Sequence, residues 1–515
     1  MLLAFLIASI AATCEPAVDP REQPLLKSDA LFSVPGRVSR MVAVRDLDGD
    51  GLDDLVVARG RRSLMHDSWS PEALDVRSSR DGRLVRTLWT RGADAPLLRD
   101  WNAGGDVDGD GTPDLILGMP RAPHDFEEAG LVEIRSGRDG RVLRVHRGTG
   151  LHDELGCSVA FLGDVDRDGY ADYLASAPQL TPSEVLLSDP SLATLSPDRA
   201  ALWLEVRSKA RERFGMVTAW SGRDGTELYA VAGDLAGYGF GLDVVATSDR
   251  DGDGACDWIA SCAPPWRAPS SWRSGATGAT LDVLQPLERN EPAWDAVDSR
   301  PSWAWSWTRP FFESAGDIDG DGFGDVFVMR CSDELTYCST YATITGRHGK
   351  TIAMIPLLDW ASQLTTVCAM GDLDADGYDE IGIGDGGFHL ASKAQLSASR
   401  SPWLAQSPWL ADEPETETLR AIPLARAAKL ESNPYGGWCS GAALIFSGRT
   451  RKPILGVFGD PGDAGGLGDR IGLAMAPLPD INGDGSPDIA IASGERIYFF
   501  AGPGVDVEAC PGSVR

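Results

Sequence analysis

Basic residues are scarce in this chain of 515 residues, which has 47 Lys and Arg against 76 Asp and Glu and a formal net charge of −29. Such a charge repels phosphate groups, so nucleic acid and anionic membranes are not expected as partners. Histidine occurs only six times, and the patterns G-x-S-x-G, H-E-x-x-H and C-x-x-C are absent. The chain therefore lacks a recognisable catalytic motif, and we expect it not to be an enzyme.

Long apolar runs are also lacking, so no transmembrane span is expected. The one marked run, Leu2–Ala12, is too short to cross a bilayer and is typical of an export signal. We predict a signal peptide at 1–13, a linker at 14–23 and a folded domain at 24–515. Cys14 follows a degenerate lipoprotein box, so we expect an extracytoplasmic protein that is either secreted or anchored by a lipid on Cys14. An unprocessed N-terminus is the remaining alternative.

Cysteine is infrequent, with nine residues in all. Removal or lipidation of Cys14 leaves eight, an even number that is compatible with disulfides in an exported protein. Cys331 and Cys338 flank a predicted hairpin loop and could form one. Cys256 and Cys262 lie along one predicted strand, too far apart to bond to each other. Buried free thiols are the equally weighted alternative.

Acidic residues, by contrast, are concentrated in a nine-residue pattern, D-x-[DN]-x-D-G-x-x-[DE], which occurs seven times. Each copy runs directly into an apolar, β-branched stretch such as LVVA, LILG or IAIA, so the unit is a structural repeat. We call the copies loops one to seven: DLDGDGLDD (46–54), DVDGDGTPD (106–114), DVDRDGYAD (164–172), DRDGDGACD (249–257), DIDGDGFGD (317–325), DLDADGYDE (372–380) and DINGDGSPD (480–488).

A second element follows each acidic loop: a β-like run, a tight Gly turn and usually another run. Glycine supplies the positive φ that hairpin turns require. Each repeat is thus interpreted as strand A, acidic loop, strand B, connection, strand C, Gly turn and strand D, which is a propeller blade. The turns are RSSRDGR (77–83), RSGRDGR (135–141), WSGRDGT (220–226), RSGATGA (273–279), TGRHGK (345–350), SGRTRK (447–452) and AGPG (501–504).

These repeats resemble the FG-GAP repeats of integrin α-subunits and related bacterial (VCBS-like) families. The third, LGCSVAFLGDVDRDGYADYLASAP (155–178), and the fourth, FGLDVVATSDRDGDGACDWIASCAP (240–264), carry the resemblance best. It implies an all-β, seven-bladed β-propeller with calcium-binding A–B loops. Most copies lack the Phe-Gly pair. The seventh repeat ends after strand C, so we predict that 25–34 supplies its outer strand and closes the ring.

The acidic positions of the loops suit Ca²⁺, which takes six to eight hard oxygen ligands. Mg²⁺ prefers octahedral sites with several waters and is less suited. An EF-hand is excluded, because position 12 lies inside a strand. The predicted ligands are Asp46, Asp106, Asp164, Asp249, Asp317, Asp372 and Asp480 at position 1; Asp48, Asp108, Asp166, Asp251, Asp319, Asp374 and Asn482 at position 3; Asp50, Asp110, Asp168, Asp253, Asp321, Asp376 and Asp484 at position 5; and Asp54, Asp114, Asp172, Asp257, Asp325, Glu380 and Asp488 at position 9.

The charge balance favours up to seven structural Ca²⁺ ions over acidic turns kept for solubility. Of the 76 acidic residues 27 occupy the ligand positions, which leaves 49 against 47 Lys and Arg. Position 7 would offer its backbone carbonyl, so its side chain is expected to vary freely. Loop four, which contains Arg250, and loop seven, which contains Asn482, are expected to be the weakest sites.

The long insertions, 179–214, 285–310 and 386–440, all fall on the end of the ring opposite the acidic loops. Since loops on a rigid scaffold commonly carry binding, we predict a monomeric, non-catalytic scaffold that binds a protein or glycan there. The alternatives are a propeller-based polysaccharide lyase or hydrolase and a passive cell-surface structural protein. Two Trp-rich segments (302–307 and 401–411) and three His-Asp pairs (66–67, 124–125 and 152–153) also fall on this face. Loop packing and independent surface pairs are their preferred interpretations.

Overall fold

The computed structural model describes residues 29–504, and every named element in this part of the chain is a β-strand. The gaps in the described range are 61–70, 94, 124–127, 151, 180–213, 235–238, 263–269, 285–311, 332–339, 347–350, 357–365, 386–440, 451–452 and 460–468.

The described strands form seven four-stranded antiparallel sheets, each built from consecutive strands except the last. We call these sheets blades one to seven in chain order. Blades one to three contain β2 (Val38–Val44), β3 (Asp54–Arg59), β4 (Ala73–Arg77) and β5 (Leu84–Thr90); β6 (Asp100–Ala103), β7 (Leu115–Met119), β8 (Leu131–Arg135) and β9 (Val142–Arg147); β10 (Val159–Gly163), β11 (Asp172–Ala177), β12 (Met216–Trp220) and β13 (Glu227–Ala232).

The remaining blades follow the same order. They contain β14 (Val244–Ala246), β15 (Trp258–Ala260), β16 (Ser270–Arg273) and β17 (Thr280–Leu284); β18 (Phe312–Gly316), β19 (Asp325–Cys331), β20 (Thr340–Thr345) and β21 (Thr351–Pro356); β22 (Thr366–Gly371), β23 (Glu380–Asp385), β24 (Ala442–Phe446) and β25 (Pro453–Phe458); β26 (Ala474–Leu478), β27 (Asp488–Ala492) and β28 (Arg496–Phe500), with β1 (Phe32–Pro35) as the fourth strand of the last.

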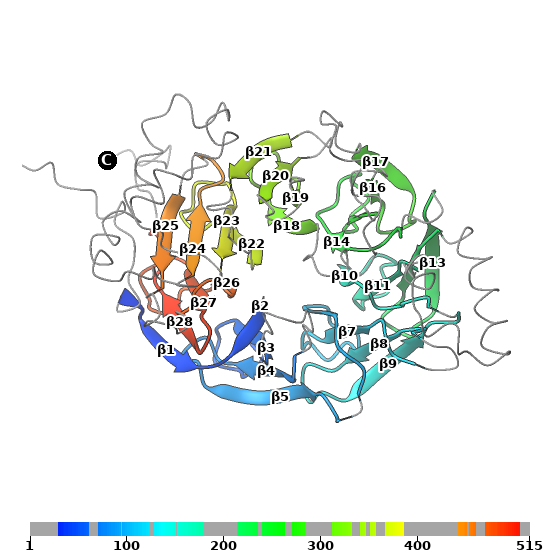
Figure 1. Cartoon of the computed structure of the whole chain (residues 1–515), viewed down its shortest axis with the longest axis horizontal. Coiled ribbons are helices and arrows are strands. Elements are labelled where there is room, and N and C mark those ends of the chain that lie inside the picture. The colour runs from blue at the N-terminus through cyan, green and yellow to red at the C-terminus, as the bar shows by residue number, and fades with distance from the viewer. Residues whose placement is uncertain are drawn as a thin grey trace, which may run out of the picture.

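The sheets are arranged around a ring, with the first strand of each towards the centre and the last at the periphery (Figure 1). The all-β, propeller-like architecture expected from the repeats is therefore confirmed. Each acidic loop joins the first two strands of its blade, and in blades one to six each Gly turn joins the last two. The strand order predicted for one repeat thus holds around the ring.

The two ends of the described chain meet in blade seven. Strand β1 pairs antiparallel with β28, placing Phe32 opposite Phe499 and Val34 opposite Ile497. The rings of Phe32 and Phe499 stack with their centroids 4.3 Å apart. This confirms that an N-terminal segment supplies the outer strand, although the described strand begins at Phe32.

The hydrophobic core lies between neighbouring blades. Strand β7 is buried along its whole length, whereas the outer strand β9 alternates between exposed and half-buried residues. The clusters of buried side chains join blades one and two, two and three, three and four, four and five, six and seven, and seven and one. Each blade is therefore stabilised by its neighbours rather than by a core of its own.

Glycines at the blade junctions explain the partial Phe-Gly pattern. Gly130, with φ of 90°, pairs in parallel with Leu155 of the next blade. A Cβ atom at Gly130 would lie 2.3 Å from the Leu155 backbone nitrogen, so a side chain does not fit. Gly441 forms the equivalent bridge to Ile471. Leu155-Gly156 and Ile471-Gly472 thus stand where Phe240-Gly241 stands in blade four, because the contact is made by the backbone.

A chain of polar contacts joins the inner strands of the first four blades. Arg40 Nη1 lies 2.7 Å from Asp100 Oδ1. Asp100 Oδ2 accepts hydrogen bonds from Ser158 Oγ at 3.1 Å and from the Val159 amide at 2.9 Å. Ser158 Oγ in turn accepts the Val244 amide at 3.1 Å. Asp100 is the central member of this chain.

Replacing Asp100 by Ala is expected to lower the free energy of unfolding by about 2 kcal/mol, because it leaves Ser158, Val159 and Arg40 without this acceptor. Urea denaturation of the purified protein measures the change. Glu495→Ala is the control: its ion pair with Arg37, at 3.2 Å, is exposed on both sides, so the expected change is close to zero. Equal effects of the two substitutions would contradict the prediction.

Candidate metal-binding loops

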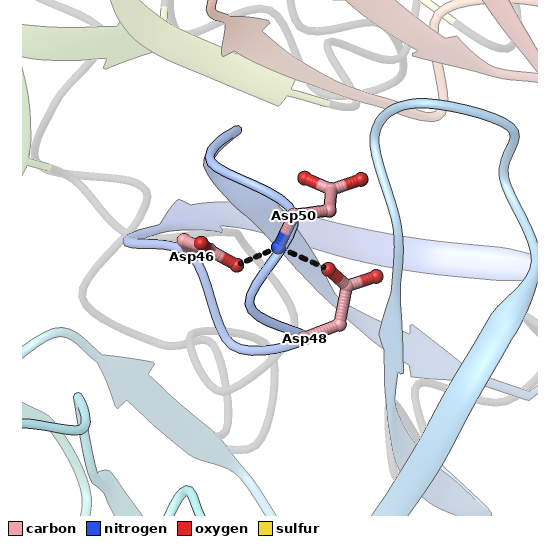
Figure 2. A group of neighbouring side chains, drawn as sticks. All are labelled: Asp46, Asp48 and Asp50. Atoms are coloured by element: carbon pink, nitrogen blue, oxygen red, sulfur yellow. Dashed lines mark hydrogen bonds between the residues drawn. The ribbon is translucent and has the colours of Figure 1, made fainter.

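The seven acidic loops share one backbone conformation that is set by the position-1 carboxylate. In loop one, Asp46 Oδ1 accepts the Gly49 amide at 2.6 Å and Oδ2 accepts the Gly51 amide at 2.8 Å. Figure 2 shows the Asp50 amide donating to Oδ1 of both Asp46 and Asp48, at 3.2 and 3.1 Å. The bond from the position-6 glycine to position 1 recurs in the other six loops.

The position-6 glycine allows this tight turn. Gly51 has φ of 90°, and all seven position-6 glycines have positive φ, a region that residues with a Cβ rarely adopt. The loop thereby turns its first three acidic residues towards one another. The sharp turn predicted at the position-6 glycine is thus present in all seven loops.

The position-9 carboxyl is completely buried in every loop, which the sequence did not reveal. In loop two, Asp114 Oδ2 accepts the Val107 amide of its own loop at 2.8 Å, and Oδ1 accepts the Gly137 amide of the Gly turn at 3.0 Å. The position-9 residues of loops three, four and seven make the same bond to the Gly turn. In these four loops, position 9 therefore joins the acidic loop to the Gly turn of its own blade.

Oxygen atoms from separate positions converge within each site. In at least five loops, three carboxylates offer oxygens that all lie within 4.8 Å of one another. Asp108 Oδ1 and Asp325 Oδ1 are buried and accept no hydrogen bond. Buried carboxylate oxygens without a donor are unfavourable next to other carboxylates, and a hard cation would satisfy them. The donor set and these oxygens fit Ca²⁺. The five groups are Asp46, Asp48 and Asp50; Asp106, Asp108 and Asp114; Asp164, Asp166 and Asp172; Asp249, Asp251 and Asp257; Asp317, Asp319 and Asp325.

Arginines of the Gly turns contact the same carboxylates in blades one and two. Arg83 lies 2.7 Å from Asp48 Oδ2, and Arg141 lies 2.5 Å from Asp108 Oδ2. Each arginine occupies one oxygen of a position-3 carboxylate, which leaves Oδ1 for a cation in the case of Asp108. Sequence reasoning missed these contacts, although the repeated RDGR turn contained the signal.

Burial raises the pKa of every position-9 carboxyl. Backbone amides have the opposite effect at position 1, where the bond from Gly51 is the main cause that lowers the pKa of Asp46. The position-9 pKa values are about 6 for Asp54 and Asp172, about 7 for Asp114 and Asp325, and about 8 for Glu380.

These shifts predict that the metal-free protein is more stable at about pH 5 than at about pH 8. The folded pKa values lie above the ordinary 3.8 of Asp, so between these values the folded state holds protons that the unfolded chain has released. The resulting stabilisation is lost as the pH rises through the folded pKa values, at about 1.4 kcal/mol per pKa unit. Urea denaturation in a chelator at both pH values tests this. A higher free energy of unfolding at the alkaline pH would contradict it.

The two loops expected to be weak differ in structure. Arg250 points away from loop four: its guanidinium lies 4.6 Å from the Trp272 ring centroid and donates to the carbonyls of Gly324 and Gly346 in blade five. Its guanidinium thus faces blade five, and the weak site expected in loop four stays a prediction. In loop seven, Asn482 Nδ2 donates to Asp484 Oδ2 and Asp488 Oδ1. A neutral amide thus replaces one carboxylate of the predicted site, and we still expect loop seven to bind a cation weakly.

The position-7 side chain makes a contact with another loop in two of the loops. A Cβ atom at Gly109 of loop two would lie 2.8 Å from the ring of Tyr170, which belongs to loop three. A Cβ atom at Gly320 of loop five would lie 2.7 Å from the ring of Tyr378, which belongs to loop six. These tyrosines therefore pack against the loop of the preceding blade.

Only one of the three His-Asp pairs lies among the described residues. His152 Nδ1 is 3.0 Å from Glu128 Oε2. Asp153 Oδ2 accepts the amides of Thr149 and Gly150, at 3.0 and 2.5 Å. These contacts agree with the interpretation as independent surface pairs. The pairs at 66–67 and 124–125, both Trp-rich segments and the segment 1–28 lie outside the described residues.

Four cysteines of the described part of the chain are free thiols: Cys157, Cys256, Cys262 and Cys368. The prediction that Cys256 and Cys262 do not bond to each other is thus confirmed, although they flank strand β15 rather than share it. Cys338, the proposed partner of Cys331, lies outside the described residues. In the part of the chain that is described, no helix is long and apolar enough to span a membrane.

Comparisons with known proteins agree with a propeller but give no family. No protein-family model matches the chain. Human integrin alpha-IIb is 34% identical over 156 residues, which cover 28% of this chain and 14% of the integrin.

Two solved structures match most of this chain in length, but their sequence identity and TM-score are low. The Saccharomyces cerevisiae Sqt1 structure covers 92% of this chain and 99% of its own, with 9% identity and a TM-score of 0.46. The C-terminal WD40 domain of Sif2 covers 92% of this chain and 97% of its own, with 8% identity and a TM-score of 0.40. At these TM-scores neither likeness carries weight, so the propeller assignment depends on the chain's own strand topology.

Proposed function

We propose that this chain is a calcium-stabilised, seven-bladed propeller of the FG-GAP type. We further propose that it acts outside the cytoplasm as a non-catalytic scaffold for a protein or glycan on the face opposite its acidic loops. The observation that carries the first part is the convergence of carboxylates within 4.8 Å at the same place in successive blades, at positions 1, 3 and 9 of loops two to five and at positions 1, 3 and 5 of loop one. The partial match to integrin alpha-IIb supports the same assignment.

Calcium accounts for these sites better than solvation does. A solvated turn would expose its carboxylates, whereas position 9 is fully buried in all seven loops. Ca²⁺ tolerates high coordination numbers and irregular geometry, and carboxylates are its common ligands. Metal analysis of the chain purified in calcium and then desalted tests the assignment. Four or more ions per chain would support it, and fewer would contradict it.

Binding is assigned to the opposite face because the insertions leave the blades there. Ala177 pairs with Met216, at the two ends of the insertion in blade three. Asp385 pairs with Ala442, at the two ends of the insertion in blade six. Antiparallel topology places these strand ends on the side of the ring away from the acidic loops. Both insertions therefore lie at positions where the pairing of the flanking strands is preserved.

This register makes clean deletions feasible. Residues 179–214 and 386–440 can each be replaced by a short Gly-Ser turn, because the flanking strands are already paired. Each variant is tested for binding to a glycan array and for cross-links to a protein partner. Loss of either signal, with an unchanged melting temperature, would support the proposal. Substitution of Asp139 by Asn, in an exposed Gly turn on the other face, is the control. Ligand cross-links that map to the acidic-loop face, or turnover of a polysaccharide, would overturn the assignment.

A further inference from the structure

Loop three contacts loop two at two points. The Tyr170 ring lies against Gly109, where a Cβ atom would approach it to 2.8 Å. The next amide, that of Ala171, donates to the carbonyl oxygen of Asp106 at 2.8 Å. Asp106 is the position-1 residue of loop two, and Tyr170 is the position-7 residue of loop three. The contact therefore joins residues that belong to two different predicted cation sites.

The same arrangement occurs three blades further on. The Tyr378 ring of loop six lies against Gly320 of loop five. The Asp379 amide donates to the Asp317 carbonyl oxygen at 2.9 Å, and the Asp317 amide donates to Asp379 Oδ2 at 2.8 Å. Asp317 is again the position-1 residue of the preceding loop. Two independent copies of one contact indicate a specific arrangement.

The sequence restricts this arrangement to two places. Tyrosine occupies position 7 only in loops three and six; the other loops have Leu52, Thr112, Ala255, Phe323 and Ser486. Each tyrosine ring is also covered by an arginine from the Gly turn of its own blade: Arg223 lies 5.9 Å from the Tyr170 centroid, and Arg449 lies 5.9 Å from that of Tyr378. Each ring is thus held between its own blade and the preceding loop.

We infer that the cation sites of loops two and three, and those of loops five and six, bind calcium as coupled pairs through Tyr170 and Tyr378. This inference depends on the proposed calcium binding. Position 7 would offer its carbonyl to the ion of its own loop, so occupation of loop three fixes the backbone around Tyr170 and Ala171. The fixed backbone orders Gly109 and Asp106 in loop two. Coupling is reciprocal, so occupation of loop two strengthens loop three equally.

Buried carboxylate oxygens are found in both loops against which a tyrosine packs. Asp108 Oδ1 in loop two and Asp325 Oδ1 in loop five accept no hydrogen bond, and both loops are the partners against which a tyrosine packs. A cation in loop two would satisfy the buried oxygen of Asp108. The contact between loops allows the neighbouring site to favour that bound state.

A double-mutant cycle on the full chain, with calcium as the only added ligand, tests the coupling. Native mass spectrometry counts the ions bound at each calcium concentration. Asp106→Asn alone is expected to remove its own ion and to weaken a second site about fivefold or more. In a Tyr170→Ala background the same substitution should remove one ion only. Tyr170→Phe, which keeps the ring, should behave like the unsubstituted chain.

Two further variants separate coupling from general damage. Asp480→Asn, in loop seven where position 7 is a serine, should remove one ion in either background. Asp317→Asn with Tyr378→Ala repeats the cycle at loops five and six if the first set folds poorly. Loss of a single ion from Asp106→Asn in the unsubstituted background, with the other sites intact, would overturn the coupling alone. A chain that binds no calcium would overturn the proposed function as well.

Discussion

Addition of saturating calcium to the chelated protein is expected to raise its Tm by about 10 °C or more. A ligand at a hundred times its Kd contributes about 2.7 kcal/mol per site when it binds the folded state only. The predicted sites are distributed around the ring, and the position-9 carboxylate of each is buried where the acidic loop meets its own blade. Differential scanning calorimetry with and without a chelator measures the shift.

Magnesium at the same concentration is the control for this experiment. Its preference for a regular octahedral shell with bound water makes it a poor fit to loops that supply four carboxylates and a carbonyl. We therefore expect a much smaller increase in Tm. Equal shifts with both ions would indicate screening of a highly negative protein rather than occupied sites.

The sequence predicted the repeating parts of the structure well, because local chemistry determines them. The wrapping of Asp46 by the amides of Gly49 and Gly51 needs only neighbouring residues. The order of strands followed from the position of each acidic loop and Gly turn. The outer strand of blade seven was predictable because the last repeat lacked one, even though the segment that fills it lies at the other end of the chain.

Contacts between distant segments could not be predicted in this way. The bond from Gly137 to Asp114 spans 23 residues, and the pattern at position 9 is the same whether its carboxylate faces water or is buried. Arg250 shows the same limit. Its position predicted a charge inside loop four, whereas Trp272 and two carbonyls of blade five determine where the guanidinium lies. Such outcomes depend on which blades become neighbours.

Substitution of Asp325 by Asn should change stability in opposite directions with and without calcium. Asp325 is fully buried, Oδ2 accepts the Ile318 amide at 2.9 Å, and Oδ1 accepts no hydrogen bond. Burial raises its pKa to about 7, so at alkaline pH the metal-free protein carries a buried charge without a cation. Asn retains an oxygen for the Ile318 amide and removes that charge. The chelated variant is therefore expected to melt at or above the Tm of the unsubstituted protein.

With calcium present, the same substitution should destabilise the protein by about 3 kcal/mol, the contribution of one saturated site. Asp321→Asn separates the two effects. Its carboxylate is exposed, and Oδ1 accepts the Phe323 amide at 3.0 Å, so its loss should matter with calcium and have little effect in chelator. Equal destabilisation of Asp325→Asn in both conditions would mean that position 9 only joins the loop to its blade. A reversal of sign, by contrast, requires an ion that compensates the buried carboxylate.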